Sequence, residues 1–449
     1  MNLGGGNIVQ VLGNIVAFVS KYLWNLFLPL IILSSIFVNY KMIKFRGIIS
    51  ERDKTKWKLS KMKSALSISL SSKIGTGAII GVLAAMWKTS NNGVGGESIV
   101  LWVFIGMFLL VPLTYSEVLF SQVTRMNPRK FIDNYIGKRA GAMYAVCLVI
   151  LYSFGFVGFQ MTGIQSVINI FSKQNFNYEF TQNGRLFFIV LPILLVVSII
   201  VITKNHRIFI NTLGSLVSII ILLYGMFFIV FVFSTRSFIP DYFSEICKDF
   251  VNFKSASMGI PIGLIIGLQR IIQISETGLG TSALASSDAE NSPRREAFIQ
   301  MISTIITTFI AVVITSYVFM YGRYNLGITL TGDGFHRIVG YLSSIITVTG
   351  YLGEGIIMIF FILSGLTTVL GSFHFLNITI NISENKRILF YLSLITLSGI
   401  LSIANFDVIF DASDLLMFIV ASINILAMVI FVSKHIEKFN IKTGGINNE

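Results

Sequence analysis

The sequence predicts an all-α polytopic membrane protein: about eleven transmembrane helices, arranged as a 5+5 inverted repeat after one extra N-terminal helix. Three observations lead to this prediction: an apolar composition, glycine-rich interruptions in two spans, and a one-sided distribution of basic residues. Of the 449 residues, 54% are hydrophobic and only 12% are charged. Apolar runs long enough to cross a bilayer recur throughout the chain.

Eleven apolar runs follow one another along the sequence. They cover residues 23–38, 64–88, 97–124, 140–172, 185–203, 210–233, 255–286, 297–322, 349–379, 387–404 and 412–433. A helix of roughly 20 residues crosses the hydrocarbon core, so several of these spans are long enough to tilt or protrude. Residues 13–21 predict an amphipathic lead-in to the first span.

Basic residues gather in the loops on one side of these spans. The loop 39–63 alone carries nine lysines and arginines against two acidic residues. Placing that loop in the cytoplasm also puts the basic loop 125–139 inside, in accord with the positive-inside rule. The chain is then expected in the plasma membrane, with its N-terminus outside and its tail, 434–449, in the cytoplasm. The net charge of +13 suits the anionic lipid of that membrane face, and we expect no nucleic-acid partner.

The second span contains a glycine-rich interruption, Gly75-Thr76-Gly77-Ala78. Glycine disfavours a continuous helix, and unwound backbone inside a bilayer is tolerated only where it is buried in protein or lines a cavity. Broken helices at this depth are typical of secondary transporters, whose freed N–H and C=O groups bind anionic groups and cations. A glycine-lined packing seam between helices is the alternative for this stretch alone.

The seventh span, 255–286, has a similar interruption and carries two charges. Arg270 and Glu276 lie in otherwise apolar sequence ahead of Gly278 and Gly280. Intramembrane charges are costly and therefore indicate function. Both residues could instead form structural hydrogen bonds that hold the broken helix ends.

The two interruptions together predict an inverted repeat. They are five spans apart, and the charge bias makes the second span begin inside and the seventh begin outside. Two such five-helix halves form the leucine-transporter type of fold, whose first and sixth core helices are broken. The predicted domains are the lead-in with the extra transmembrane helix, 1–38; a basic cytoplasmic loop, 39–63; the two repeats, 64–233 and 255–433; and the cytoplasmic tail, 434–449.

Several short motifs also match a known pattern. They are KIGTG at 73–77, Trp102, Glu117, GFQ at 158–160, RIIQISETGLG at 270–280, TTVLG at 367–371 and DLLM at 414–417. On these residues the chain resembles the alanine or glycine:cation symporters, sodium-coupled carriers of small amino acids, over nearly its whole length. The resemblance implies a transporter and not an enzyme, with sodium as the co-transported ion and no organic cofactor.

The chain departs from that family in the expected pocket. Ala78 replaces the asparagine that follows GTG, while Ser275 and Thr277 stand where the family has asparagine and alanine. Ser372 replaces a tryptophan, which would enlarge one side of the pocket. These changes leave the side chain and the stereochemistry of the substrate open. The sequence also leaves the oligomeric state open, with a monomer as one option.

The broken helices are expected to hold the substrate. Backbone N–H groups around the first break would bind its carboxylate, as helix N-termini bind anions. Carbonyls of the second break and the amide oxygen of Gln160 would meet its ammonium group. The predicted substrate-binding residues are Thr76, Gly77, Ala78, Gln160, Ser275, Thr277, Gly278, Leu279, Gly280 and Ser372.

The resemblance also implies a sodium site between the first and eighth core helices. A hard cation requires oxygen ligands. The implied ligands are the carbonyls of Ser71, Ile74 and Ser364 and the hydroxyls of Thr367 and Thr368. Both threonines could instead donate hydrogen bonds to carbonyls one turn earlier in their own helix.

Lys73, Arg270 and Glu276 are assigned structural or coupling roles. Lys73 could place its own ammonium where related carriers hold a cation, or it could lock onto Glu276. His374 could titrate near neutral pH, or it could simply be hydrogen-bonded. A proton-coupled carrier of the same fold, with one of these groups titrating, is the main alternative, and a non-transporting amino-acid sensor is another.

Overall fold

Helices make up the regular structure of the chain in the residues that the computed structural model describes. These are residues 5–44, 70, 73, 75–203, 206–252, 261–287, 291–404 and 406–435. Most of the predicted basic loop, 39–63, and nearly all of the predicted tail, 434–449, lie outside them. The same is true of most of the first half of the second predicted span.

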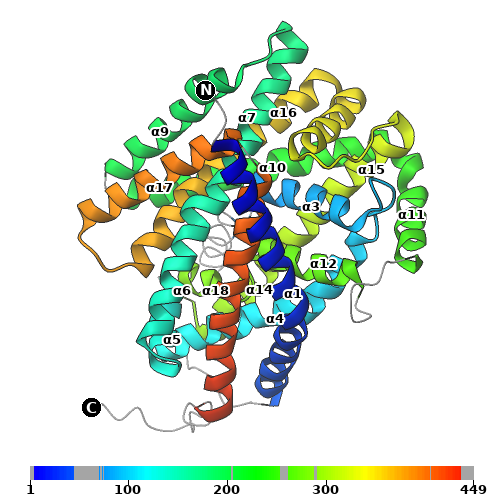
Figure 1. Ribbon diagram of the computed structural model, residues 1–449. Coiled ribbons are helices and arrows are strands. Elements are labelled where there is room, and N and C mark those ends of the chain that lie inside the picture. Colours follow the sequence, from blue (N-terminus) through cyan, green and yellow to red (C-terminus); the bar gives the residue numbers. More distant parts are fainter. Residues whose placement is uncertain are drawn as a thin grey trace.

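The helices follow one another along the chain (Figure 1). Short π or 3₁₀ segments carry the label η. The elements are α1 (Gly5–Lys44), α3 (Thr76–Thr89), α4 (Ile99–Thr124), α5 (Pro128–Tyr135), α6 (Lys138–Ile150), η2 (Leu151–Phe156), α7 (Val157–Phe176), α8 (Gln182–Arg185), η3 (Leu186–Val190), α9 (Leu191–Ile202), α10 (His206–Ser234), η4 (Arg236–Phe238), α11 (Ile239–Val251), α12 (Ile262–Ser275), α13 (Thr281–Ala285), α14 (Pro293–Phe309), η5 (Ile310–Ile314), α15 (Thr315–Leu326), α16 (Gly334–Thr379), α17 (Glu384–Ala404) and α18 (Phe406–Lys434).

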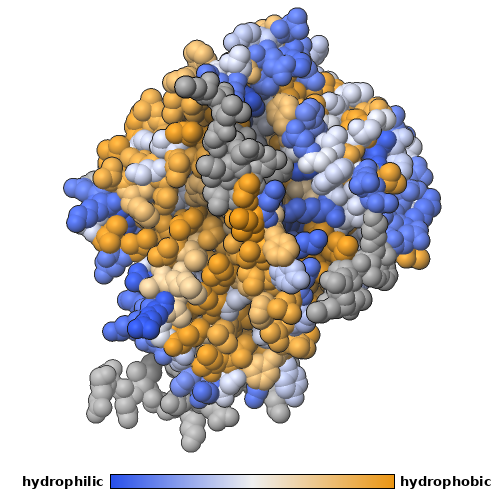
Figure 2. Space-filling model, in the orientation of Figure 1, coloured by the Kyte–Doolittle hydropathy of each residue, from blue (hydrophilic) through white to orange (hydrophobic). Residues whose placement is uncertain are grey.

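The lengths of these helices confirm a multi-span membrane protein. Eight continuous helical segments in the described residues are long and apolar enough to cross a membrane, and the bent pair Ile219–Ser234 and Arg236–Val251 makes a ninth if it is one span. Two shorter apolar helices, α3 and α12, occupy the interrupted second and seventh spans. Hydrophobic residues cover the middle of the face in Figure 2, and hydrophilic residues gather toward its margins. In the described residues, each of the eleven predicted runs thus overlaps an apolar helix.

Three segments differ from the predicted boundaries. The lead-in 13–21 and the first span belong to one helix, α1. Helix α11 follows α10 after a bend of 77°. The sequence did not predict it, because four of its residues are charged and a span buried in the bilayer carries few charges. Helix α16 begins at Gly334, well before the predicted span, and bends at Gly350, where φ is +63°. Glycine adopts this left-handed conformation at low cost.

The extra N-terminal helix packs along the last helix of the chain. Figure 1 shows α1 and α18 side by side and running in the same direction. The face of α1 that is buried carries Trp24, Leu28, Ile31 and Val38. The indole Nε1 of Trp24 donates a hydrogen bond of 3.0 Å to the backbone carbonyl of Asp414. This helix is therefore part of the packed bundle.

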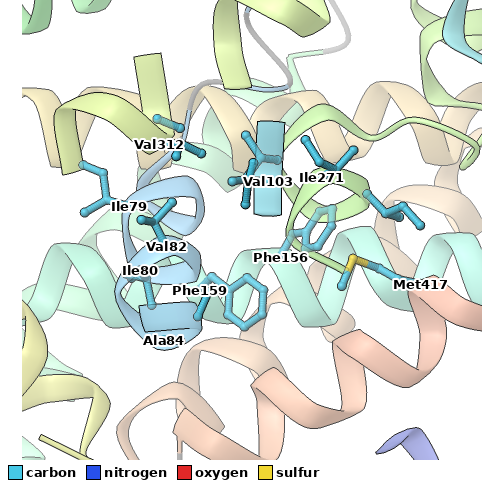
Figure 3. Packing of buried hydrophobic residues seen from close by; sticks show 14 of the residues in the cluster. Ile79, Ile80, Val82, Ala84, Val103, Phe156, Phe159, Ile271, Val312 and Met417 are labelled. Carbon is cyan, nitrogen blue, oxygen red and sulfur yellow. The ribbon is translucent and has the colours of Figure 1, made fainter. Parts of the chain in front are cut away.

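Helix α3 lies inside the bundle and is covered on all sides. Every residue from Thr76 to Met86 except Ala78 is buried. Its apolar side chains share one hydrophobic cluster with Phe159 of α7 and with residues of α4, α12 and α18 (Figure 3). A helix that is apolar all round belongs in such a central position. The first break therefore opens into the middle of the protein.

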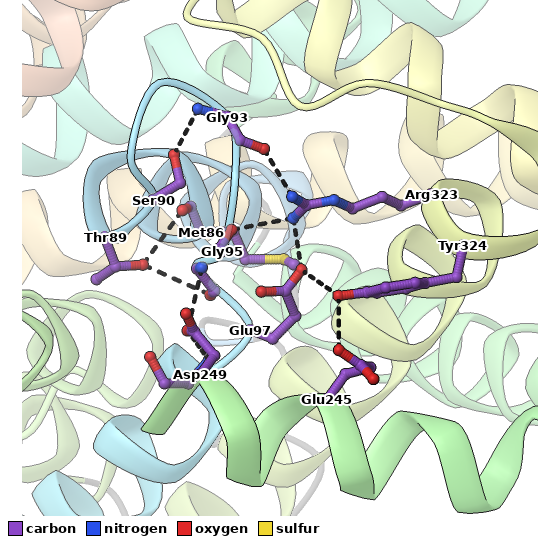
Figure 4. Close-up of polar contacts among 12 residues, drawn as sticks. Met86, Thr89, Ser90, Gly93, Gly95, Glu97, Glu245, Asp249, Arg323 and Tyr324 are labelled. Carbon is purple, nitrogen blue, oxygen red and sulfur yellow. Dashed lines mark hydrogen bonds and ion pairs between the residues drawn. The ribbon is translucent and has the colours of Figure 1, made fainter. Parts of the chain in front are cut away.

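The turn that follows α3 is held by two charged side chains from distant helices (Figure 4). Arg323 at the end of α15 donates to the carbonyls of Gly93 (2.8 Å) and Gly95 (3.0 Å) and to the carboxylate of Glu97 (2.5 Å). Asp249 of α11 accepts from the backbone N–H groups of Gly96 and Ser98, at 3.1 and 2.8 Å.

This turn requires glycine, because Gly93, Gly95 and Gly96 all have positive φ. One guanidinium and one carboxylate thus satisfy four of its backbone groups: the carbonyls of Gly93 and Gly95 and the N–H groups of Gly96 and Ser98. We refer to Gly93–Ser98 with Asp249 and Arg323 as the turn clamp. It attaches the end of α3 to α11 and α15.

The close approach of α12 to α4 generates a stability prediction. A Cβ added at Gly267 would lie 2.8 Å from the backbone carbon and oxygen of Trp102, which cannot rotate away. Gly267→Ala should therefore push the helices apart and lower the free energy of unfolding by about 1–3 kcal/mol. The measurement is thermal unfolding of the purified protein in detergent.

Gly225→Ala in α10 is the matched control, because in the described residues no atom outside its own stretch of helix lies within 4 Å of the added Cβ. Alanine favours helix over glycine, so this control should be neutral or slightly stabilising. Equal melting temperatures for the two variants would contradict the prediction.

Candidate functional site

The first break has an extended residue followed by a helix N-terminus. Gly75 has φ −139° and ψ 168°, and α3 begins at Thr76. The amide oxygen of Gln160, from α7, accepts hydrogen bonds from the Thr76 N–H (2.9 Å) and hydroxyl (2.6 Å). A Cβ at Gly75 would lie 2.8 Å from the Gln160 amide nitrogen and 2.7 Å from the hydroxyl oxygen of Thr368. The glycine thus lets side chains of α7 and α16 reach the break.

The second break separates α12 from α13. Helix α12 ends at Ser275 and α13 begins at Thr281. Between them Glu276, Gly278 and Gly280 all have positive φ, at 58°, 81° and 88°. A non-glycine residue with positive φ is strained, and such strain is found preferentially at functional sites.

Polar groups of the second break bond to neighbouring helices. The hydroxyls of Ser275 and Thr277 and the carbonyls of Gly278 and Leu279 all have partners. The pairs are Ser275 with Thr277 (2.8 Å), Thr277 with Thr114 (2.8 Å), Gly278 with Asn424 (2.9 Å) and Leu279 with Tyr144 (2.6 Å). The bonds to the Gly278 and Leu279 carbonyls replace those that a continuous helix would have formed.

A small cavity lies between the two breaks. Its lining residues come from both breaks, from η2 and α7, and from α16. They are Lys73, Gly75, Gly77, Ala78, Phe156, Phe159, Gln160, Gln273, Ile274, Glu276 and Thr368. The volume is about 30 Å³, which is room for about two water molecules. An amino acid is larger, so its binding requires lining side chains such as Gln160 to move.

The structure brings only some of the predicted substrate residues to this cavity. Gly77, Ala78 and Gln160 line it, and Thr76 is hydrogen-bonded to Gln160. Ser372 bonds instead to Tyr391 of α17 (3.0 Å). The remaining predicted residues, Ser275, Thr277, Gly278, Leu279 and Gly280, belong to the second break but do not line the cavity. Their roles stay predictions.

The proposed sodium ligands on α16 converge on one carbonyl. The hydroxyls of Thr367 and Thr368 donate to the Ser364 carbonyl at 2.9 and 3.0 Å. This is the bonding within one helix that the sequence offered as an alternative. It leaves hydroxyl lone pairs that can still bind a cation. Ser71 and Ile74 lie outside the described residues.

Two acidic groups act electrostatically on the buried Lys73. Its ammonium donates to the Thr304 hydroxyl of α14 at 2.8 Å, and it interacts electrostatically with Glu276 and Glu117. The Glu276 carboxylate accepts from the Thr281 hydroxyl at 2.8 Å. Because an isolated buried charge is very costly, these groups stabilise one another. Lys73 is thus joined to α14 as well as to the second break.

Arg270 forms a buried ion pair that the sequence reasoning missed. No part of Arg270 is exposed, and its guanidinium binds both carboxylate oxygens of Asp414, at 2.5 and 2.7 Å. It also stacks on the Phe410 ring and donates to the side-chain oxygen of Gln273. The available signal was the acidic residue of the DLLM motif, since opposite charges inside a membrane are expected to pair.

Lys88, near the end of α3, extends this ion pair. Its ammonium lies 3.2 Å from the Asp411 carboxylate and 3.6 Å from that of Asp414. Two basic and two acidic groups from α3, α12 and α18 therefore meet. The buried Arg270–Asp414 pair joins the second broken helix to the last helix.

The family follows from comparison of the whole chain. The sequence profile of the sodium:alanine symporter family matches residues 9–442. The chain belongs to the sodium:alanine symporter family. It is therefore a membrane transporter of a sodium-coupled amino-acid symporter family and not an enzyme, as the motifs implied.

Two bacterial transporters are distant relatives of the chain. The probable sodium/glutamine symporter GlnT of Bacillus subtilis is 23% identical over 93% of this chain and 88% of its own length. The amino-acid carrier protein AlsT of the same species is 23% identical over 91% of this chain and 87% of its own.

Two solved structures confirm the leucine-transporter type of fold. One is MhsT in complex with L-phenylalanine, with a TM-score of 0.55 and 15% identity over 84% of this chain and 96% of that one. The other is a Na⁺-coupled sialic acid symporter, with a TM-score of 0.50 and 12% identity over 96% and 82%. At these identities the likeness concerns the fold alone.

The Arg270–Asp414 pair gives a second stability prediction. Asp414→Asn leaves a fully buried guanidinium without its carboxylate and should lower the free energy of unfolding by about 3–5 kcal/mol. Arg270→Met should cost less, because Lys88 remains beside Asp414. The double variant should recover part of the loss. Chemical unfolding in detergent, analysed as a double-mutant cycle, measures all three.

The exposed pair Lys173–Glu179, at 2.7 Å, is the control. Exposed ion pairs contribute little, so Glu179→Gln should leave stability almost unchanged. If Asp414→Asn were equally harmless, the buried pair would not have the structural role assigned to it.

Proposed function

We propose that this member of the family imports a small neutral amino acid together with sodium by alternating access. The observation that carries the proposal is the cavity between two broken helices, where a helix N-terminus, the Gln160 amide and the Thr368 hydroxyl meet. Alanine and glycine are the first substrates to test. We place the protein in the plasma membrane with its N-terminus outside.

The substrate carboxylate is proposed to bind at the start of α3. There it would displace the Gln160 oxygen from the Thr76 N–H. A carboxylate binds this N–H more favourably than a neutral amide oxygen does, because the helix N-terminus carries a partial positive charge. Gln160 would then turn its amide toward the substrate. This exchange gives the amino acid the room that the small cavity lacks.

Sodium is proposed to join α16 to the first break. Thr368 already lies against Gly75, and the Ser364 carbonyl and Thr367 hydroxyl are within reach of the same point. The ion and the substrate drive import only if each binds one conformational state more tightly than the other. Each sodium that enters contributes about 2.3 kcal/mol per 100 mV of membrane potential.

Proton coupling is the alternative that a specific observation favours. Two ionisable groups, Lys73 and Glu276, line the cavity, and a third, Glu117, interacts electrostatically with Lys73. A relative named as a putative sodium/proton-dependent alanine carrier, YrbD of Bacillus subtilis, is 27% identical over 62% of this chain and 56% of its own length. A sensor that binds without transport is a third possibility for this site.

Uptake into proteoliposomes tests the coupling ion. Labelled alanine or glycine should accumulate with an inward sodium gradient and not when potassium replaces sodium. Replacing both ligand hydroxyls, Thr367→Val with Thr368→Val, should raise the sodium concentration for half-maximal uptake at least about tenfold, equivalent to about 1.4 kcal/mol.

Thr347→Val is the matched control, because this exposed threonine of α16 makes the same bond to a carbonyl one turn earlier, away from the cavity. Its uptake should equal that of the unmodified protein. Uptake that follows a proton gradient would contradict sodium coupling. Binding without uptake under any gradient would favour the sensor.

A further inference from the structure

A buried glutamine in the cavity has a free hydrogen-bond donor. Gln273 of α12 lines the cavity and is only 7% exposed. Its side-chain oxygen accepts a hydrogen bond from Arg270, and its amide nitrogen has no partner in the part of the chain that the structure describes. Since a guanidinium can only donate, Arg270 decides which end of the amide is oxygen. The N–H₂ group of Gln273 is therefore the free end.

This donor is held in position by the charges behind it. Arg270 is fixed by two bonds to Asp414 and by the ring of Phe410. A donor whose orientation is already set loses little conformational entropy when it binds a ligand. A buried donor without an acceptor is unfavourable, and a ligand oxygen would relieve that cost.

The donor lies about one helical turn from the proposed carboxylate site. A Cβ at Gly81 would lie 2.6 Å from the Gln273 oxygen, and a Cβ at Gly77 would lie 3.3 Å from the Gln160 nitrogen. Residues 77 and 81 are on the same face of α3, about 6 Å apart along its axis. Gln160 of α7 and Gln273 of α12 thus lie beside successive turns of α3, and both line the same cavity.

We propose that Gln273 determines substrate specificity by donating a hydrogen bond to an oxygen of the substrate side chain. The inference rests on the proposed function, and it narrows the substrate class to neutral amino acids with a hydroxyl or carboxamide side chain. With its carboxylate at Thr76, such a substrate directs its side chain along α3 toward Gln273. An apolar side chain leaves the donor unpaired, and an acidic one meets the carboxylate of Glu276 in the same cavity.

The test compares ligands that differ in little but the oxygen. Serine is compared with alanine, and asparagine with leucine, as competitors of labelled amino-acid uptake into proteoliposomes. Serine and asparagine should each compete at least tenfold better than their apolar counterparts. Glutamate should compete poorly. In Gln273→Leu both ratios should fall to near one, mainly through weaker binding of serine and asparagine.

Two further variants separate hydrogen bonding from folding. Gln273→Glu keeps an acceptor for Arg270 but loses the N–H₂ group, so it should lose the preference as well. Gln165→Leu alters a buried glutamine of α7 that does not line the cavity and should keep the preference. Ratios that are unchanged in Gln273→Leu, or a protein that prefers alanine to serine, would overturn the proposal.

A binding measurement keeps this proposal distinct from the proposed function. Each amino acid is added to the detergent-solubilised protein and the rise in melting temperature is recorded. A rise with asparagine and not with leucine, lost in Gln273→Leu, supports the role of Gln273 even if no uptake occurs. Equal rises with both amino acids refute that role and leave symport intact. No rise and no uptake with any amino acid refute both.

Discussion

Breaking a helix inside a membrane frees backbone N–H and C=O groups that lipid cannot satisfy, and the arrangement around α3 and α12 meets this constraint. Side chains from other helices take the place of the missing helical bonds. Gln160 accepts from the N–H of Thr76, and Asn424 and Tyr144 donate to carbonyls of the second break. The groups that satisfy the breaks come from α6, α7 and α18. The bundle therefore has to be assembled around the breaks, and a ligand can compete for bonds that already exist.

Charges inside the bundle obey a related rule. Arg270 is matched by Asp414, and Lys73 lies among Glu276, Glu117 and the hydroxyl of Thr304. Each of these groups would be very costly alone, so each fixes the helix that carries its partner. The same interactions orient neutral side chains. The Gln273 amide oxygen is held by a paired arginine, which leaves its nitrogen without a partner in the described residues.

The sequence predicted the parts of this arrangement that depend on local chemistry. Glycines marked both breaks, apolar runs marked the spans, and the intramembrane charges marked α12. Helix α11 and the beginning of α16 were missed, because helices outside the spans carry mixed polar and apolar residues. The Arg270–Asp414 pair joins residues far apart in the chain, and such pairing is set by packing that periodicity does not reveal. Gln273 stood beside recognised residues, but its free nitrogen follows only from that ion pair.

The contact of α1 with α18 has a consequence for how the protein is made. Trp24 and its buried neighbours lie on α1, which leaves the ribosome long before the residues of α18 that they contact. Contacts between distant parts of a chain form slowly, and partly built membrane bundles have unpaired surfaces. Until α18 is inserted, α1 lacks its main packing partner and Arg270 lacks Asp414. The nascent chain therefore has to carry an uncompensated arginine until α18 has been made, a stage at which insertion machinery or a chaperone could hold it.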